Sequence, residues 1–407
     1  MEGARTRGHP AALVAVASMI RGGAPHAVLL AGPAGIGKTT LALDLAAGLL
    51  CTADDVERRP CGTCRACRLA FSWSHPDLHR IGPEGPGRQV VIGGPGSRIR
   101  GIRDLIGELS LLPVEGGARV AVVEGAHRMN EDAQAALLKT LEEPPTGVTL
   151  ILCADAEEPL LPTIRSRCAR LRLGPVGTRD VEAILEEHGV ADAPLAARLA
   201  RIAAGRPGLA FAWARQPDAL RARDELSRSL LDLLAARPAE RLAGVRAAVA
   251  RAGALAVVTE KVGEASAGAA SSATGTAGPP PAATPPPPDD LASSNAIDAD
   301  ASPTEDAGPA VRVPAVERRR SAEALVGLWT DVARDLALSS RGLASSVRDL
   351  GLLDETNAQA ARLDGSALDA FLDRLGRAAV LLVGNVSPEL VLDDLALAWP
   401  RPRSAAA

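Results

Sequence analysis

The chain has 407 residues, of which 47% are hydrophobic and 23% charged, and its formal net charge is −4. This length predicts two or three globular domains, and the charge excludes an overall basic surface for autonomous DNA binding. Aromatic residues make up 2% of the chain, with no tyrosine, which argues against stacking platforms for single-stranded nucleic acid. No run of about 18 apolar residues occurs, so no membrane span is expected and the protein is expected to be cytoplasmic.

The first motif along the chain is a phosphate-binding loop over residues 32–39, Gly-Pro-Ala-Gly-Ile-Gly-Lys-Thr. It fits G-x-x-x-x-G-K-[ST], in which backbone N–H groups cradle phosphates, the lysine reaches the terminal phosphates and the hydroxyl holds Mg²⁺. A strand is predicted before it at 27–31 and a helix after it at 39–50, so that the helix N-terminus points at the phosphates of ATP or ADP. The predicted nucleotide-binding residues of this segment are Gly32, Pro33, Gly35, Gly37, Lys38, Thr39 and Thr40.

Four cysteines follow this helix with the spacing C-x₉-C-x₂-C-x₂-C: Cys51, Cys61, Cys64 and Cys67. Four thiolates can enclose Zn²⁺ tetrahedrally, and filling all four positions is typical of a structural site. An iron–sulfur cluster also uses four thiolates, and a cluster without metal is a further alternative. Nothing indicates secretion, so disulfides are not favoured. The spacing predicts a structural zinc knuckle over residues 51–67.

Strand runs and amphipathic helices alternate up to about residue 175, which predicts an α/β domain with a parallel sheet and flanking helices. Further strands are predicted at 77–81, 89–92, 119–124 and 148–153.

The predicted central strand ends in one acidic residue, Glu124, where a complete water-activating motif has two. Gly125 stands in the second position. The next acids, Glu131 and Asp132, begin a helix that Asn130 is predicted to cap, so they are displaced from the strand end. Glu124 is therefore a predicted nucleotide-site residue, and hydrolysis is expected to be weak or absent.

Two later segments carry a family resemblance: Leu137 to Pro145, LLKTLEEPP, and Leu161 to Cys168, LPTIRSRC. Together with the phosphate loop and the four cysteines, they resemble the AAA+ clamp-loader subunits of bacterial DNA polymerase III over about residues 10–215. The expected architecture is an AAA+ P-loop domain over 1–175 followed by a small helical lid over 176–216.

Residues 217–261 and 312–400 are helix-like and are predicted to form a C-terminal all-α collar domain. Between them, residues 262–311 are rich in Pro, Ala and acidic residues and contain no Lys or Arg. Such a composition cannot bury enough apolar surface to fold, so a disordered insertion is predicted there.

Within this family the motor subunits, gamma and tau, carry two acids at the end of the central strand. The pair Glu124-Gly125 departs from that pattern and resembles the delta-prime branch. The resemblance implies a subunit that assembles with the gamma/tau motor subunits and the delta subunit and helps to load the sliding clamp onto primer–template DNA.

The resemblance also assigns roles to two arginines. Arg167, in Ser-Arg-Cys, is expected to act in trans as an arginine finger at a neighbour's nucleotide, a role that suits a planar, permanently charged guanidinium. The alternative is an arginine paired with an acid at the sheet end. Arg206, in Gly-Arg-Pro-Gly, resembles a second nucleotide sensor, and its alternative is a plain helix-terminating turn.

Two other hypotheses stay open at this point. One is an active, gamma/tau-like ATPase that uses Lys38, Thr39 and Glu124 with another acid positioning the water. The other is a zinc-stabilised, nucleotide-sensing DNA repair protein without a clamp partner. ATPase activity of the purified chain would distinguish the gamma/tau-like ATPase from a delta-prime-like subunit. Co-purification with motor and clamp subunits would distinguish a delta-prime-like subunit from the repair protein.

Overall fold

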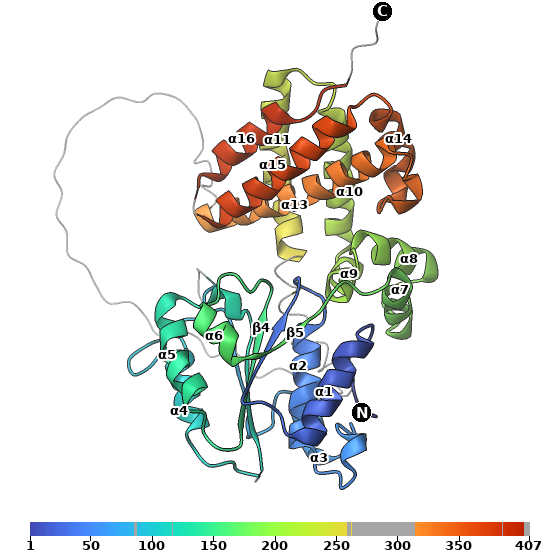
Figure 1. Ribbon diagram of the computed structural model, residues 1–407. Helices are drawn as coiled ribbons and strands as arrows, with labels where there is room; N and C mark the ends of the chain where they lie inside the picture. Colours follow the sequence, from blue (N-terminus) through green and yellow to red (C-terminus); the bar gives the residue numbers. More distant parts are fainter. Residues whose placement is uncertain (85–87, 116, 259–261, 263–313, 385, 403–407) are drawn as a thin grey trace, which may run out of the picture.

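The computed structural model describes residues 1–84, 88–115, 117–258, 262, 314–384 and 386–402. A part built on a β-sheet and an all-helical part lie one above the other in Figure 1. Except for Val262, the insertion predicted at 262–311 lies outside the described residues. No helix among the described residues combines the length and the apolar character that crossing a membrane requires.

A five-stranded parallel sheet forms the centre of the N-terminal part, in the order β2-β3-β4-β1-β5. Strands β1, β3 and β4 are buried along their whole length, as expected for apolar strands that are covered on both faces. Because neighbouring strands run in parallel, the loops that follow them gather at one edge. The strands are β1 (Ala27–Ala31), β2 (Leu78–Ile81), β3 (Arg119–Val123), β4 (Val148–Ala154) and β5 (Ala169–Arg172).

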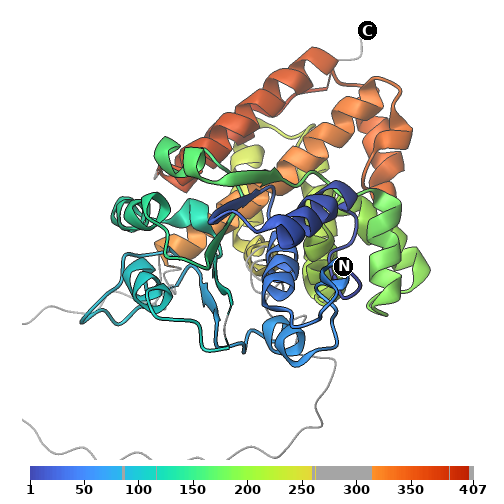
Figure 2. The ribbon, with the colours of Figure 1, turned by 60° about the horizontal axis from the view of Figure 1, so that its bottom comes forward.

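Helices cover both faces of this sheet (Figure 2). Alternate side chains of β1 enter two separate cores, Val28 and Leu30 on one face and Ala27 and Leu29 on the other, which is the two-residue period of a strand. The helices of the first face are α1 (Pro10–Gly22), α2 (Lys38–Leu50) and α3 (Arg65–Phe71). Those of the second are α4 (Ile102–Leu109), α5 (Glu131–Glu142) and α6 (Pro162–Arg167).

The strand predicted at residues 89–92 is wrong. This segment makes isolated bridges, from Gln89 to Glu84 and from Val90 to Met129, and is not a strand of the sheet. The next two residues, Gly93 and Gly94, have φ angles of 63° and 110°. These left-handed conformations turn the backbone before a ladder can form.

Three helices follow the sheet: α7 (Thr178–Glu187), α8 (Ala193–Ile202) and α9 (Pro207–Ala214). Their buried side chains belong to one continuous core with those of the upper part, which includes a further helical stretch at 253–258. The upper helices are α10 (Pro217–Asp232), α11 (Pro238–Arg251), α13 (Ala315–Ser340), α14 (Leu353–Ala360), α15 (Gly365–Val383) and α16 (Pro388–Ala398). Short 3-10 turns lie at Val56–Arg58, Ala126–Arg128, Ala344–Ser346 and Leu350–Leu352.

The upper part is organised around the 26-residue helix α13. Its Trp329 is fully buried and packs with Phe371 of α15 and with Trp399, at ring-centroid distances of 5.6 and 5.5 Å. Arg241, 1% exposed, donates to the carbonyl oxygens of Leu234, Trp399 and Pro400. The buried guanidinium is thereby hydrogen-bonded, as a buried charge must be, and it fixes the chain after α16.

Candidate nucleotide site and cysteine cluster

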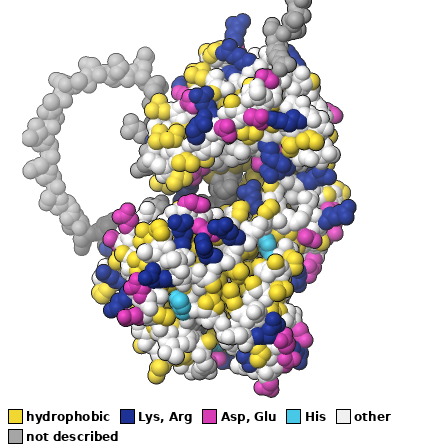
Figure 3. All heavy atoms as spheres, in the orientation of Figure 1, with side chains coloured by type: hydrophobic (Ala, Val, Ile, Leu, Met, Phe, Trp, Pro, Cys, Tyr) yellow, Lys and Arg dark blue, Asp and Glu magenta, His cyan; other side chains and the backbone are white. Residues whose placement is uncertain are grey.

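A cavity of about 950 Å³ lies between the carboxyl edge of the sheet and the upper helices. Figure 3 shows the surface hollowed between the two parts. Among its lining residues are members of the phosphate loop, the ends of β3 and β4, helix α9 and helix α13: Gly35, Gly37, Lys38, Thr39, Glu124, Asp155, Arg206 and Asp331. The predicted residues Gly32, Pro33 and Thr40 belong to the same loop and helix but are not among the described lining residues.

The phosphate loop connects β1 to α2 as the sequence predicts. Gly35 and Gly37 have φ angles of 77° and 108°, which glycine adopts without the steric cost of a Cβ atom. At Gly32 a Cβ atom would lie 2.4 Å from the carbonyl oxygen of Leu173. Gly37 is the N-cap of α2, so the free N–H groups of this helix open into the cavity, an arrangement that favours anions.

Lys38 is folded onto its own loop. Its ammonium group donates to the carbonyl oxygens of Gly32 and Pro33 at 2.6 and 2.9 Å, and it lies 2.7 Å from Oδ1 of Asp155. The Lys38 side chain is 8% exposed and that of Asp155 is 38% exposed. Three acceptors therefore surround the three N–H donors of this lysine.

Glu124 follows β3 and faces the loop. Nη2 of Arg80 lies 2.6 Å from its Oε2, and the guanidinium of Arg80 stacks over the ring of Trp73, 4.8 Å from its centroid. Burial raises the pKa of Glu124, against the lowering influence of Arg80 and Thr39. The acid beside the predicted Mg²⁺-binding hydroxyl is thus already bound to a cation.

Gly125 leaves no room for a second acid in this backbone conformation. Its φ is 58°, and a Cβ atom there would lie 2.7 Å from Cγ of Pro83. Any side chain at this position would meet both backbone strain and a steric clash. The single-acid strand end is therefore built into the local structure.

Sequence reasoning missed Asp155, the residue directly after β4. The sequence places an acid after a buried strand, but nothing local shows that β4 lies beside β1 and brings Asp155 to Lys38. His127 supports it: the backbone N–H of Asp155 donates to Nδ1 of His127 at 3.1 Å. Burial lowers the pKa of His127, so the imidazole is neutral at neutral pH and can accept this bond.

Arg206 is the N-cap of α9 and lines the cavity together with Trp213 of the same helix. Burial lowers the pKa of Arg206, while Asp331 of α13 acts in the opposite direction. The helix also touches the phosphate loop directly, because the N–H of Gly208 donates to the carbonyl oxygen of Gly35 at 2.8 Å. Arg206 thus lines the same cavity as the phosphate loop.

Arg167 lies at the end of α6, outside the described lining of the cavity. Its Nη2 donates to Oε1 of Glu142 at 2.8 Å and its Nη1 donates to the carbonyl oxygen of Thr163 at 3.1 Å. The side chain is 35% exposed. Figure 3 shows Lys and Arg side chains gathered on this face of the sheet part. The structure does not bring Arg167 to the chain's own phosphate loop.

The four predicted cysteines come together after α2. Their Sγ atoms all lie within 4.8 Å of one another, with Cys51 to Cys64 at 3.9 Å and Cys61 to Cys67 at 4.0 Å. Sulfurs around a tetrahedral zinc with Zn–S bonds of about 2.3 Å would lie about 3.8 Å apart. Burial would raise the pKa of Cys61, but N–H donors including that of Cys64 lower it to about 6. The pKa of Cys64 is lowered as well, whereas burial raises the pKa of Cys51 and of Cys67. The positions of the four sulfurs suit a metal ion.

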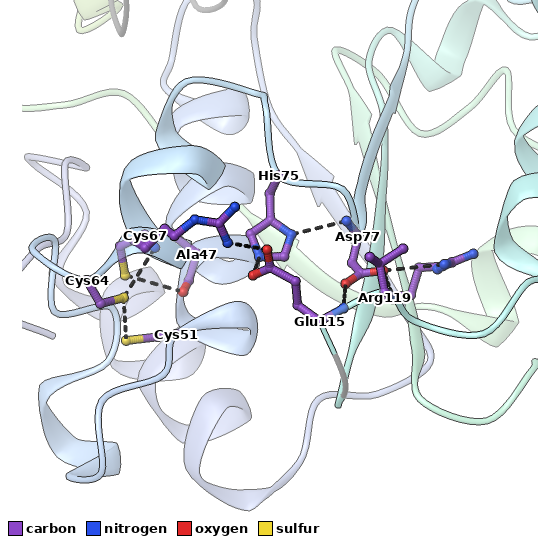
Figure 4. A network of polar contacts seen from close by, with 10 residues as sticks. Ala47, Cys51, Cys64, Cys67, His75, Asp77, Glu115 and Arg119 are labelled. Atoms are coloured by element: carbon purple, nitrogen blue, oxygen red, sulfur yellow. Dashed lines mark hydrogen bonds and ion pairs between the residues drawn. The ribbon is translucent and has the colours of Figure 1, made fainter.

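A series of polar contacts connects this cluster to the sheet (Figure 4). Arg65, between two of the cysteines, pairs with Glu115, which lies 3.5 Å from Nε2 of His75. Nδ1 of His75 accepts the N–H of Asp77 at 3.1 Å, and Asp77 pairs with Arg119 at 3.3 Å. His75 and Asp77 precede β2, and Arg119 begins β3. The cysteines lie at the opposite end of α2 from the phosphate loop, about 20 Å along the helix, so they take no part in phosphate chemistry.

The strand order of the sheet, the phosphate loop between β1 and α2 and the helical part that touches this loop define an AAA+ P-loop protein. Residues 10–177 match the family model described as "DNA polymerase III, delta subunit". Together with the relatives described next, this match shows that the N-terminal part of the chain is similar to DNA polymerase III delta-prime subunits.

DNA polymerase III subunit delta' of Pseudomonas aeruginosa is 41% identical over 150 residues, which cover 36% of this chain and 42% of that protein. Subunit delta' of Escherichia coli is 35% identical over 216 residues, covering 53% and 62%. Subunit tau of Escherichia coli is 34% identical over 185 residues, covering 44% and 27%. The chain therefore spans less than two thirds of the length of these relatives.

Proposed function

We propose that this protein is a non-motor subunit of a sliding-clamp loader, equivalent to delta-prime. It would assemble with gamma/tau-type motor subunits and a delta subunit to load the clamp onto primer–template DNA. The observation that carries the proposal is the end of β3, where Gly125 replaces the second acid and Glu124 is already paired with Arg80. A motor subunit needs a free carboxylate there to orient the attacking water.

The test of this role is reconstitution. The full chain is mixed with motor, delta and clamp subunits, and a stable complex that loads clamps onto primed DNA is expected by gel filtration and a loading assay. Omitting this chain should abolish loading. A chain that binds none of these subunits would favour the alternative of a nucleotide-sensing repair protein.

The proposal includes weak binding of ATP or ADP with Mg²⁺ at the phosphate loop. Lys38 and the N-terminus of α2 would hold the phosphates, Thr39 with Glu124 the Mg²⁺, and Arg206 would contact the nucleotide from α9. Mg²⁺ would neutralise phosphate charge when bound. The support is the shared cavity that these side chains line.

We expect the purified chain to hydrolyse ATP at a negligible rate, since Gly125 and not a second acid follows Glu124 at the end of β3. The measurement is phosphate release with and without primed DNA, with Lys38→Ala as the control for contaminating ATPases. DNA-stimulated turnover that disappears in Lys38→Ala would instead establish the active gamma/tau-like ATPase.

The proposal further assigns a structural Zn²⁺ to Cys51, Cys61, Cys64 and Cys67. Support comes from their separations and from backbone N–H donors to two of the sulfurs, Cys64 N to Cys61 Sγ and Cys67 N to Cys64 Sγ, each at 3.3 Å. Such donors stabilise thiolates, and binding of a structural metal contributes directly to folding free energy. An arginine finger in trans is the remaining part of the proposal, and the partly exposed position of Arg167 supports it.

A further inference from the structure

Lys38 has no N–H donor to spare for a phosphate. Two donors go to the carbonyl oxygens of Gly32 and Pro33, and the third faces the Asp155 carboxylate at 2.7 Å. A nucleotide phosphate that binds this lysine must therefore replace one of these three acceptors. The carboxylate is the one that carries a full charge and the one that competes most directly with a phosphate oxygen.

His127 holds Asp155 in this position. Its backbone N–H donates to Nδ1 of His127, and its Oδ2 lies 3.6 Å from Nε2 of the same ring. Its side chain remains 38% exposed on the cavity side. The acid that follows β3, Glu124, is already paired with Arg80 at 2.6 Å. Asp155 is therefore the carboxylate whose charge an incoming phosphate would meet beside Lys38.

We propose that Asp155 competes with nucleotide phosphate for Lys38. This competition gives the site a low affinity for nucleotide and a preference for ADP over ATP. With Lys38 paired to Asp155, the loop presents little net positive charge. Each added phosphate brings more negative charge toward the same carboxylate, and like charges at close range repel strongly in a partly buried site. The site consequently discriminates against ATP relative to ADP. This inference rests on the proposed nucleotide binding.

The test is calorimetric titration of the full chain with MgATP and with MgADP. Asp155→Asn should raise the affinity for MgATP at least about tenfold, because a neutral amide neither pairs with Lys38 as an ion nor repels phosphate, and should raise that for MgADP by less. The matched control is Glu158→Gln, which removes one negative charge three residues further along at an exposed position. Its affinities should stay at the wild-type values.

A double variant distinguishes competition from a general change in structure. In the Lys38→Ala background, Asp155→Asn should give no gain in affinity, since the lysine for which it competes has gone. The melting temperature without nucleotide should not rise in Asp155→Asn. A gain that persists without Lys38, or an Asp155→Asn affinity equal to that of Glu158→Gln, overturns the proposal.

The outcomes also separate this inference from the proposed function. If wild type, Asp155→Asn and Glu158→Gln all fail to bind nucleotide but still assemble with motor subunits, the competitor role is wrong and the subunit role stands. If the affinity changes appear as described but no complex forms, the subunit role is wrong and Asp155 keeps its assignment.

Discussion

Arg167→Ala should leave this chain folded and able to join the clamp loader, yet lower ATP hydrolysis by the assembled complex. The side chain is partly exposed and pairs with Glu142 at the surface, and such pairs contribute little to stability. If Arg167 reaches a neighbour's nucleotide, its loss removes a cation from the transferring phosphoryl group. A full finger is worth on the order of 10³-fold at the site it serves.

The reconstituted complex is the right system for this experiment, because the loss is expected at the neighbour's site. Other interfaces keep their own fingers, so total hydrolysis and clamp loading should fall by less than the single-site effect. Arg167→Lys should rescue little, since an ammonium cannot make two parallel bonds to phosphate oxygens. Arg170→Ala is the matched control: this arginine lies three residues away on β5, is 51% exposed and also pairs with a glutamate, Glu157.

Wild-type rates of ATP hydrolysis and clamp loading in the Arg167→Ala complex would show that Arg167 is a structural partner of Glu142. An equal loss in Arg170→Ala would point to the general charge of this face and not to a finger.

Cys64→Ser should lower the zinc content of the chain from about one ion and destabilise the segment from residue 51 to residue 67. A serine hydroxyl is a much poorer zinc ligand than a thiolate, and apparent binding free energies of about 10–16 kcal/mol for structural zinc sites show how much folding depends on the metal. The expected result is a lower melting temperature together with faster proteolysis near the cysteines.

Metal content is measured by elemental analysis of protein purified under reducing conditions, and iron is measured in the same samples. Cys168→Ser is the control, because this cysteine is buried at the end of α6, away from the cluster, and its loss should leave the zinc content unchanged. Wild-type protein without zinc, or with iron at the same stoichiometry, would refute the zinc assignment.

The local sequence was sufficient to predict the first strand of the sheet, the phosphate loop and the helix that follows it. The apolar run at 27–31, the glycine loop and the following helix are predicted because strand, turn and helix each leave a signal over a few neighbouring residues. The cap at Asn130 is found for the same reason: its side chain accepts the N–H of Ala133 at 3.0 Å. The cysteines also converge as their short spacing predicts.

The electrostatics of the site could not be predicted in this way. Arg80 and Glu124 are 44 residues apart, and Asp155 lies still further from Lys38. Each pair forms only because β2 lies beside β3, and β1 beside β4, in the folded sheet. The strand prediction for residues 89–92 was wrong because the local pattern itself is ambiguous. Its apolar run is also compatible with a loop that makes a single bridge, and periodicity cannot distinguish the two over four residues.

The distribution of the four tryptophans makes the chain suitable for fluorescence. Because the sequence contains no tyrosine, the fluorescence comes from tryptophan even when the protein is excited at wavelengths that tyrosine would absorb. Trp329 and Trp399 are buried in the upper core, whereas Trp213 lines the cavity and Trp73 lies under Arg80 beside Glu124. A change in quenching or emission wavelength on adding nucleotide would therefore arise at the two site tryptophans, with the other two acting as a built-in reference and no label attached.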